Sequence, residues 1–309
     1  MPPPRLSIKF SSLLMTVQGQ GFTLQKLGGV SAYDIMLGLS GLSSQHPIIV
    51  RFAGGLIQPT IPKENIKRVA DVATGTGAWL IDTAKELNNP TNTYHGFDIS
   101  VASFPSEIPS DMGKISFLEH NALERFPIEF HGQFDLINIR MVVQAFKSAE
   151  VPKVISNLME ILRPGGFLQW GDLLWKDTES VPPNDDLEAV MKLGRKHMKF
   201  HGVTENLPAL VESTMKELGM QDVVLTRKSA DDAVPPLSVI EVDSACVPAL
   251  LSALSKFLET HLISENQPID SAVIEAKRAE LSTRFNEAYA NGYTLIWFFC
   301  VVVGRKPLE

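Results

Sequence analysis

The chain has 309 residues, of which 44% are hydrophobic and 20% are charged. A soluble domain of this size buries about three quarters of its unfolded surface, so it requires neither disulfides nor a structural metal, and its two cysteines exclude a disulfide framework. The formal charge of 28 − 35 = −7 argues against a long phosphate-binding surface, and we expect no nucleic-acid partner.

The first 30 residues show no hydrophobic period and are rich in glycine, serine and glutamine. They fit a mobile leader or an arm that binds a partner, including a second copy of the chain in a homodimer. A helix is expected from Ser31, which can cap its N-terminus, and Gly54 and Gly55 interrupt the chain before the main fold.

Export and membrane insertion are not expected. The N-terminus lacks the continuous apolar segment and the small-residue cleavage site of a signal peptide. The most apolar run, residues 295–303, is nine residues long, whereas a spanning helix needs roughly 20. We interpret this run as a buried strand and expect a soluble, cytoplasmic protein without a membrane partner.

Short apolar runs alternate with amphipathic stretches between residues 67 and 172. Strands are expected over 67–73, 93–98, 115–119, 134–139 and 166–172, and helices over 78–88 and 151–162. This alternation predicts an α/β fold with a mostly parallel sheet covered on both faces. Such sheets bind ligands beyond the carboxyl ends of their strands, where the strand order reverses.

The second half of the chain is mostly helical. Helices are expected over 182–219 and 245–290, and strands over 223–226 and 293–303. The sheet is therefore completed late, and the helical insertions can cover its ligand edge. We divide the chain into an N-terminal arm and helical lid (1–60) and a catalytic domain (61–309).

The turn after the first strand of the sheet contains the strongest local signal. The strand runs into a turn with two glycines, Gly75 and Gly77, and a helix follows. Glycine lets a ligand approach the backbone closely, and the free N–H groups at the helix start are expected to face that ligand. The turn therefore indicates a nucleotide-like ligand.

Two carboxylates accompany this turn. Asp98 ends the second strand, 98 − 77 = 21 residues after the last glycine, which is the spacing of an acid that accepts hydrogen bonds from ribose hydroxyls. A helix N-cap is an alternative role for Asp98. Asp71 lies inside the first strand, where a buried carboxylate needs a partner, either a cationic ligand or the backbone N–H groups of the turn.

The same residues separate two classes of cofactor. A dinucleotide turn has a third glycine, and Leu80 stands at that position. An acid at the end of the first strand repels a pyrophosphate, but it suits a cofactor with an amino group and a sulfonium. This pattern favours S-adenosylmethionine over a nicotinamide cofactor.

Several stretches together match one known family. They are Leu42-Ser-Ser-Gln-His46, Ala70-Asp-Val-Ala-Thr-Gly-Thr-Gly-Ala-Trp79, Gly96-Phe-Asp-Ile-Ser100, Phe134-Asp-Leu-Ile137 and Leu162-Arg-Pro-Gly-Gly-Phe-Leu-Gln-Trp170. They cover residues 42–175, and residues 303–307 fit the last strand of the family. On these stretches the chain resembles a class I S-adenosylmethionine-dependent methyltransferase of the fungal secondary-metabolite subgroup.

The resemblance implies a Rossmann-like sheet of seven strands whose last strand is antiparallel. It also implies that Asp98 holds the ribose, that Asn121 and Ala122 border the adenine, and that residues 138–141 face the methionine end of the cofactor. Ala73 stands where the family often has the first glycine of the turn, and Asn121 replaces a commoner aspartate. The cofactor-binding residues expected on this basis are Asp71, Ala73, Thr74, Gly75, Gly77, Asp98, Ile99, Asn121, Ala122, Ile139, Arg140 and Met141.

A catalytic base is optional, because methyl transfer from a sulfonium mainly requires that the nucleophile and the methyl group be close and collinear. A phenol benefits from a base, whereas a neutral amine does not need one. The candidates are His46 in the lid-like segment, His197 in the first insertion, and Asp172 at the end of a strand. No metal site is expected.

Substrate contacts are expected near the same edge of the sheet. His201 follows His197 by four residues, which places both on one helix face. Trp170 is either a substrate contact or a core residue. The expected substrate residues are Gln45, Gln144, Trp170 and His201. Apolar residues of the insertions either line a greasy substrate cavity or pack on the sheet; they are Met191, Met198, Leu250, Leu251, Leu254, Phe257 and Leu258.

Three functions fit these patterns. The first is an O- or N-methyltransferase acting on a small, largely apolar secondary metabolite. The second is an enzyme of the same fold that catalyses a cyclisation, pericyclic rearrangement or dehydration without methyl transfer. The third is a non-enzymatic regulator that binds a protein partner through residues 1–40.

Overall fold

The computed structural model describes residues 7–10, 13–18, 21–24, 39–108 and 112–309, with side chains from Gln45 onward. The chain divides into two compact units. One, the sheet unit, comprises His46–Lys176, His201–Ser238 and Trp297–Glu309. The other, the helical unit, comprises Met1–Gln45, Asp177–Phe200 and Val239–Ile296. This division differs from the expected boundary at residue 60, because two insertions join the N-terminal part in the helical unit.

The sheet unit is built on a sheet of seven strands in the order β10-β12-β8-β7-β4-β5-β6. The strands are β4 (Arg68–Val72), β5 (Thr93–Asp98), β6 (Lys114–Glu119), β7 (Phe134–Arg140), β8 (Leu162–Leu173), β10 (Gln221–Lys228) and β12 (Phe299–Arg305). The last strand, β12, runs antiparallel to both of its neighbours, β8 and β10, whereas β4 to β8 pair in parallel. The expected α/β fold is therefore confirmed, including its antiparallel last strand.

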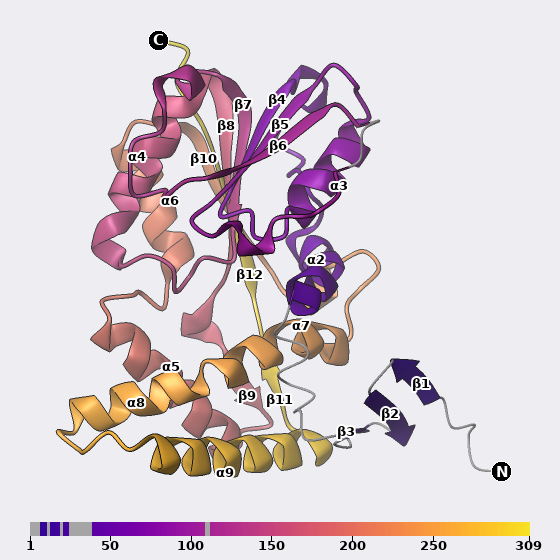
Figure 1. The fold of residues 1–309 in the computed structure, drawn as a ribbon, viewed down its shortest axis with the longest axis vertical. Coiled ribbons are helices and arrows are strands. Elements are labelled where there is room, and N and C mark those ends of the chain that lie inside the picture. Colours follow the sequence, from indigo (N-terminus) through magenta and orange to yellow (C-terminus); the bar gives the residue numbers. More distant parts are fainter. Residues whose placement is uncertain (1–6, 11–12, 19–20, 25–38, 109–111) are drawn as a thin grey trace. The chain divides into compact units, whose positions relative to one another are not determined.

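Helices cover both faces of this sheet. They are α2 (Leu39–Ala53, which enters the unit at His46), α3 (Ala78–Leu87), α4 (Val151–Ile161) and α6 (Leu207–Glu217). Figure 1 shows α3 on one face and α4 and α6 on the other. Strands that are buried on both faces are rich in apolar residues, and the buried runs of β4 and β7 are mostly apolar, with Asp71, Asp135 and Asn138 as buried polar exceptions.

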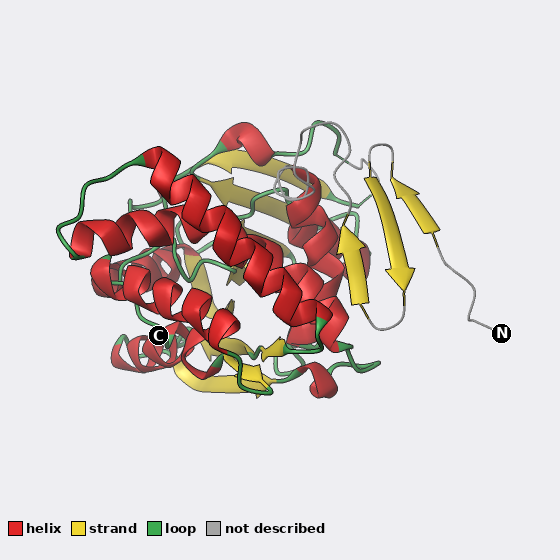
Figure 2. Ribbon diagram, turned by 90° about the horizontal axis from the view of Figure 1, so that it is seen from below, coloured by secondary structure: helices red, strands yellow, loops and turns green. Residues whose placement is uncertain are grey.

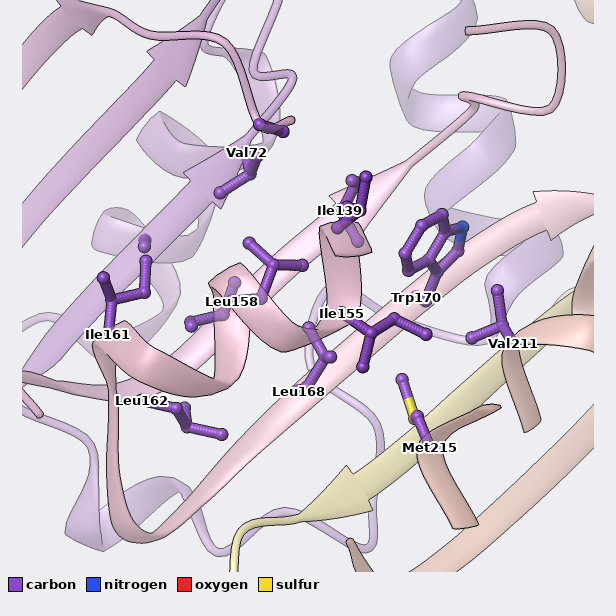
Figure 3. Close-up of a cluster of buried hydrophobic side chains, with 14 of the residues drawn as sticks. Val72, Ile139, Ile155, Leu158, Ile161, Leu162, Leu168, Trp170, Val211 and Met215 are labelled. Carbon is purple, nitrogen blue, oxygen red and sulfur yellow. The ribbon is translucent and has the colours of Figure 1, made fainter. Parts of the chain in front are cut away.

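The side chains of α4 and α6 form the core on their face of the sheet. Leu158 of α4 is fully buried, as are Trp170 of β8 and Met215 of α6. Figure 3 shows these side chains gathered over β7 and β8 together with residues from α4. This packing fixes the carboxyl ends of β7 and β8, which carry part of the candidate site.

The expected elements between residues 67 and 172 are all present. The largest difference is in β8, which begins at Leu162 rather than at 166. Two expectations for the second half were wrong. Helix α6 contributes to the core of the sheet unit instead of covering its ligand edge. The apolar run 295–303 is two strands, β11 (Thr294–Ile296) and β12, because β11 pairs with β9 (Glu179–Val181) while β12 pairs with β8 and β10.

The part of the helical unit that the structure describes contains four long helices. They are α5 (Asp185–Phe200), α7 (Val239–Ser252), α8 (Leu254–Ser264) and α9 (Ser271–Ala290). Helices α5, α8 and α9 contact one another, and they lie together in both ribbon views (Figures 1 and 2). The apolar residues that were considered for a substrate cavity are buried in this unit, so they form its own core; they are Met191, Met198, Leu250, Leu251, Leu254, Phe257 and Leu258.

The N-terminal part contains regular structure where none was expected. Strands β1 (Ser7–Phe10), β2 (Leu13–Gln18) and β3 (Gly21–Leu24) form an antiparallel sheet. The start of the helix expected from Ser31 lies outside the described residues, and α2 begins at Leu39. Short 3-10 helices connect the other elements; they are Lys63–Asn65, Val101–Ser103, Ile128–Phe130, Ser148–Glu150, Trp175–Asp177 and Ala230–Asp232.

None of the individual helices in the described part of the chain has the length and apolarity needed to cross a membrane. Helices α7 and α8 meet that criterion only when they are taken as a pair, and the pair bends by 43° at the break between them.

Candidate active site

Asp71 lies where the strand order of the sheet reverses. It is at the end of β4 and pairs in register with Asn138 of β7. Its two carboxylate oxygens accept hydrogen bonds from the hydroxyl of Thr74 (2.6 Å) and from the Nδ2 of Asn138 (2.7 Å). These two side chains provide the hydrogen-bond partners of the buried carboxylate, so it needs neither a ligand nor the backbone N–H groups of the turn, contrary to our expectation. Burial nevertheless raises the pKa of Asp71 from 3.8 to about 6.

The turn after β4 has a left-handed backbone at three positions. Ala73, Gly75 and Gly77 have φ angles of 56°, 55° and 71°. The N–H groups of this turn were expected to face a ligand, but three of them are bonded within the chain. Those of Thr74 and Gly77 donate to backbone carbonyls, and that of Gly75 donates to Asp98. Ligand recognition at this edge therefore depends on side chains more than on these N–H groups.

Asp98 ends β5, the strand beside β4. Its Oδ2 accepts from the backbone N–H of Gly75 at 2.8 Å, and its Oδ1 accepts from that of Ser100 at 3.0 Å. Each carboxylate oxygen has a second lone pair, so the half-buried group retains the capacity to accept from hydroxyls. The next residue, Ile99, is 67% exposed. An acceptor beside an exposed apolar side chain suits a sugar linked to a flat apolar ring.

The loop after β6 supplies Asn121 and Ala122. The Oδ1 of Asn121 accepts from the backbone N–H of Leu123 at 3.0 Å, which fixes the amide in a local turn. Ala122 is buried, and its carbonyl accepts from the Nδ2 of Asn157 on α4. This loop is therefore held in place by the core and by its own hydrogen bonds.

The end of β7 places Arg140 beside His46 of α2. The Nη2 of Arg140 donates to the Nδ1 of His46 at 2.6 Å, and the Nε2 of His46 lies 3.1 Å from the Oδ2 of Asp82 on α3. Because Nδ1 accepts, the ring carries its proton on Nε2 and donates it to Asp82. Burial and the nearby Arg140 lower the pKa of His46 from 6.5 to about 4, so the ring is neutral at pH 7.

The residues on either side of Arg140 have different environments. The side chain of Ile139 is fully buried in the core, so only its backbone can face a ligand. Met141 has a φ angle of 56° and is 36% exposed, and its N–H donates to the carbonyl of Gly171. The chain thus turns sharply after β7 and leaves Met141 at the surface of the sheet edge.

A narrow pocket of about 10 Å³, with room for about one water molecule, lies where α2 meets the ends of β7, β8 and β12. Asn138, Arg140 and Gln169 form part of its lining, and apolar walls come from Ile49 and Phe299 among others. The pocket therefore combines apolar walls with the guanidinium and two amides at the reversal of strand order.

A family model for a methyltransferase domain matches residues 70–168, which run from β4 into β8. The methyltransferase grgD of a Penicillium species is 33% identical over 175 residues, which cover 54% of this chain and 60% of that protein. The N-methyltransferase verN of Clonostachys rogersoniana is 31% identical over 130 residues, which cover 41% of this chain and 44% of that protein. Residues 70–168 form a class I S-adenosylmethionine-dependent methyltransferase domain.

This chain spans only part of the curated relatives of its methyltransferase domain, 60% and 44% of the length of the two named above. Among solved structures, the phosphoethanolamine N-methyltransferase 2 of Haemonchus contortus in complex with S-adenosyl-L-methionine aligns with 93% of this chain and 63% of its own. The sequence identity is 14% and the TM-score is 0.43, a likeness too distant to indicate a substrate.

The residues of the methyltransferase domain fit S-adenosylmethionine, which is the cofactor of this class. Asp98 can accept from the ribose hydroxyls, and Ile99 offers an exposed apolar surface next to it. Asp71 supplies a negative charge and Arg140 a positive one, as the ammonium and carboxylate of a methionine end require. Ala73 in place of glycine does not distort the turn, because it adopts the same left-handed conformation.

Two of the expected substrate and catalytic residues have structural roles in the sheet unit. Of the two roles expected for Trp170, substrate contact or core residue, the second holds: its side chain is 1% exposed and lies in the core against α4 and α6 (Figure 3). Asp172 is also 1% exposed, and its carboxylate accepts from the backbone N–H groups of Val142 and Leu173. Burial raises the pKa of Asp172 from 3.8 to about 7. Its carboxylate thus holds the loop after β7.

The two histidines of the first insertion do not share a helix face, contrary to our expectation. Helix α5 ends at Phe200, and His201 lies in the following turn and belongs to the sheet unit. His197 stays in the helical unit, where its Nδ1 lies 2.8 Å from the hydroxyl of Thr260. Gln144 is exposed in the loop after β7, and Gln45 is partly buried in α2.

Sequence reasoning missed two residues of the site. Gln169 donates from Nε2 to the Oδ1 of Asn138 at 3.1 Å and thereby orients the amide that holds Asp71. A glutamine inside a buried apolar strand is the sequence signal that points to this residue. Asp82 contacts His46 from 36 positions away, and no local pattern indicates that contact.

Proposed function

We propose that this protein transfers the methyl group of S-adenosylmethionine to an oxygen or nitrogen atom of a small, largely apolar metabolite. The observation that supports it is the arrangement of Asp71, Asp98 and Arg140 at the ends of three adjacent strands. These side chains match the ammonium, the ribose and the carboxylate of one cofactor. The curated relatives named as methyltransferases support the reaction class.

The cofactor supplies a methyl group on a sulfonium, which a nucleophile displaces in line. The task of the protein is to bind, to orient and to exclude water, which brings a large gain in effective concentration. Asp98 holds the sugar end and Asp71 with Arg140 holds the amino-acid end. Apolar side chains near the end of β7, with Ile49 and Phe299 among them, support an apolar acceptor.

Two of the three residues predicted as a catalytic base, His46 and Asp172, are engaged in other hydrogen bonds. Both ring nitrogens of His46 are engaged, by Arg140 and by Asp82. Both carboxylate oxygens of Asp172 accept backbone N–H groups. An acceptor that needs little help to lose its proton, such as a neutral amine or an acidic phenol, therefore fits best. His197 remains a prediction.

The decisive experiment is incubation of the purified full chain with methyl-labelled S-adenosylmethionine and a panel of apolar amines and phenols, followed by mass spectrometry. We expect a product heavier than the acceptor by one CH₂ group. Asp98→Ala serves as the matched control and should lose label transfer. A product of unchanged mass would favour the non-methylating alternative. No transfer together with no binding of S-adenosylhomocysteine in calorimetry would overturn the proposal.

We further propose that the N-terminal strands β1 to β3 mediate association with a second copy of the chain. An antiparallel sheet of three short strands presents edges to which another chain can add. Light scattering on the full chain and on a variant without residues 1–30 tests this. A dimer that persists after the truncation would contradict it.

A further inference from the structure

The guanidinium of Arg140 is largely unused by the described part of the chain. It has five N–H donors, and its one hydrogen bond there goes to His46. It forms no ion pair with a described carboxylate, although Asp71 and Asp82 are near enough to raise its pKa against the effect of burial. A half-buried cation with free donors at a ligand edge is ready to bind an anion.

The position of this cation identifies the anion. Arg140 lies two residues beyond Asn138, the register partner of Asp71, so opposite charges flank the point where the strand order reverses. An α-amino acid presents an ammonium and a carboxylate on one carbon. The amino-acid end of the cofactor therefore matches Asp71 and Arg140 with the correct signs.

The position of the guanidinium is controlled by its contact with His46. An arginine side chain has many rotamers, and losing that freedom on binding costs affinity unless the group is already held in place. His46 is 5% exposed, and its ring accepts one Nη2 donor at 2.6 Å. The other nitrogen of the ring is directed to Asp82, which in turn accepts from Lys85 at 2.7 Å.

We propose that His46 is a positioning residue: it holds the guanidinium of Arg140 for the carboxylate of the cofactor, and Asp82 fixes the tautomer that makes this possible. This inference rests on the proposed function. It replaces the catalytic role first considered for His46, since a ring with both nitrogens engaged does not accept a proton from a substrate. It also ties α2 to the cofactor site through one side chain.

The test uses two ligands that differ only in the carboxylate. They are S-adenosylhomocysteine and its decarboxylated analogue, which keeps the amine, and their dissociation constants are measured by calorimetry on the full chain. A charge-assisted hydrogen bond predicts that the wild-type protein prefers S-adenosylhomocysteine by about tenfold or more. Arg140→Lys keeps the positive charge but lacks the planar set of N–H donors that can bind both oxygens of a carboxylate, so it should lose most of this preference.

The variants of His46 separate positioning from a merely structural role. His46→Leu removes the acceptor, so the preference should fall to about threefold or less while the affinity for the decarboxylated analogue stays unchanged. His46→Gln keeps an acceptor oxygen and should restore most of the preference. Asp82→Ala should lower the preference for the carboxylate-bearing ligand. Asp82→Asn should not lower it, because the amide oxygen still accepts from the Nε2 of His46. His131→Leu, at a distant turn, is the control and should behave as wild type.

The outcomes are distinguishable. Equal weakening of both ligands in His46→Leu, or a wild-type protein that does not prefer the carboxylate, would overturn the inference and leave the proposed function intact. If His46→Leu does not fold, as judged by circular dichroism, Arg140→Lys and His46→Gln still test whether His46 positions Arg140 for the carboxylate. If the wild-type protein binds neither ligand, the proposed function fails and this inference fails with it.

Discussion

The Oδ2 of Asp98 accepts a hydrogen bond of 2.8 Å from the backbone N–H of Gly75, so the carboxylate at the end of β5 holds the turn that follows β4. The same carboxylate also binds the N–H of Ser100. One side chain therefore shapes two neighbouring loops and also offers acceptors to a ribose. Its structural role and its ligand-binding role are combined in the same two oxygens.

Substitution of Asp98 is expected to affect binding more than stability. Asp98→Ala should weaken S-adenosylhomocysteine binding by about a hundredfold and lower the free energy of unfolding by about 1–2 kcal/mol, because it removes ligand acceptors and leaves two N–H groups without a partner. Asp98→Asn keeps one acceptor and should lose about tenfold in affinity. Calorimetry and urea unfolding measure both effects. If Asp98→Ala bound S-adenosylhomocysteine as tightly as the wild-type protein, the assignment of Asp98 to the cofactor site would be wrong.

Cofactor affinity is expected to depend on the protonation of Asp71. Burial raises its pKa from 3.8 to about 6, and only the ionised carboxylate attracts an ammonium. Binding should therefore weaken as the pH falls through 6, by about tenfold at pH 5 relative to pH 7.5. Calorimetry across this range gives the profile. Asp71→Asn should bind weakly and show no such step; a step of the same size in that variant would assign it to another group.

The stability of the protein is expected to fall with rising pH because of Asp172. Its pKa in the folded protein is about 7, above the ordinary 3.8, so the folded state binds the proton more tightly. The resulting stabilisation is complete below about pH 4 and is lost as the pH rises through 7. Compared with Asp172→Asn, the wild-type protein should lose on the order of 1–3 kcal/mol of unfolding free energy between pH 5 and pH 8. If the unfolding free energies of the two proteins changed with pH in the same way, Asp172 would not be the source of the pH dependence.

Most of the sheet unit could be predicted from the sequence because central strands such as β4, β7 and β8 are largely buried. Mostly apolar runs such as that of β7, in which Asp135 and Asn138 are the polar interruptions, have few other interpretations, and the glycine turn after β4 marks the end of that strand. The apolar run 295–303 was harder. Both of its halves are apolar, but they pair with strands in different units, and strand partners are a long-range property.

The candidate site was predictable in its residues but less so in their roles. Asp71 and Arg140 were expected at the cofactor, but the contacts that orient them come from Asn138 and His46, which are distant in sequence. The end of α5 is different, because a local signal existed. Gly202 has a φ angle of 71°, as a glycine that terminates a helix does, and α5 ends at Phe200, which leaves His201 outside the helix that holds His197.

Ala73 is expected to carry a removable strain. Its φ angle of 56° places a Cβ atom in the left-handed region, which costs about 1–2 kcal/mol for a residue other than glycine. Ala73→Gly should stabilise the protein by about 0.5–1 kcal/mol, since part of the relief is lost to the greater freedom of the unfolded chain. Ala73→Val should destabilise it. Thermal unfolding measures both, and a lower stability of Ala73→Gly would show that the methyl group matters more than the strain.

Gly77 is required by packing as well as by its backbone conformation. A Cβ atom at Gly77 would lie 2.5 Å from the ring of Phe117, and the φ angle there is 71°. Gly132 has a similar φ angle of 61°, but a Cβ atom there would meet nothing within 4 Å. The two positions therefore share the backbone strain and differ in the clash, which makes Gly132→Ala a matched control.

We expect Gly132→Ala to cost about 1 kcal/mol of unfolding free energy and Gly77→Ala about 2–4 kcal/mol, because overpacking adds to the strain. Phe117→Leu should recover part of the difference when it is combined with Gly77→Ala. Urea unfolding of the two single variants and the double variant gives the coupling energy between the two positions, which should exceed about 0.5 kcal/mol. Equal costs for the two alanine variants, with no coupling to Phe117, would mean that backbone strain alone determines the need for glycine at this turn.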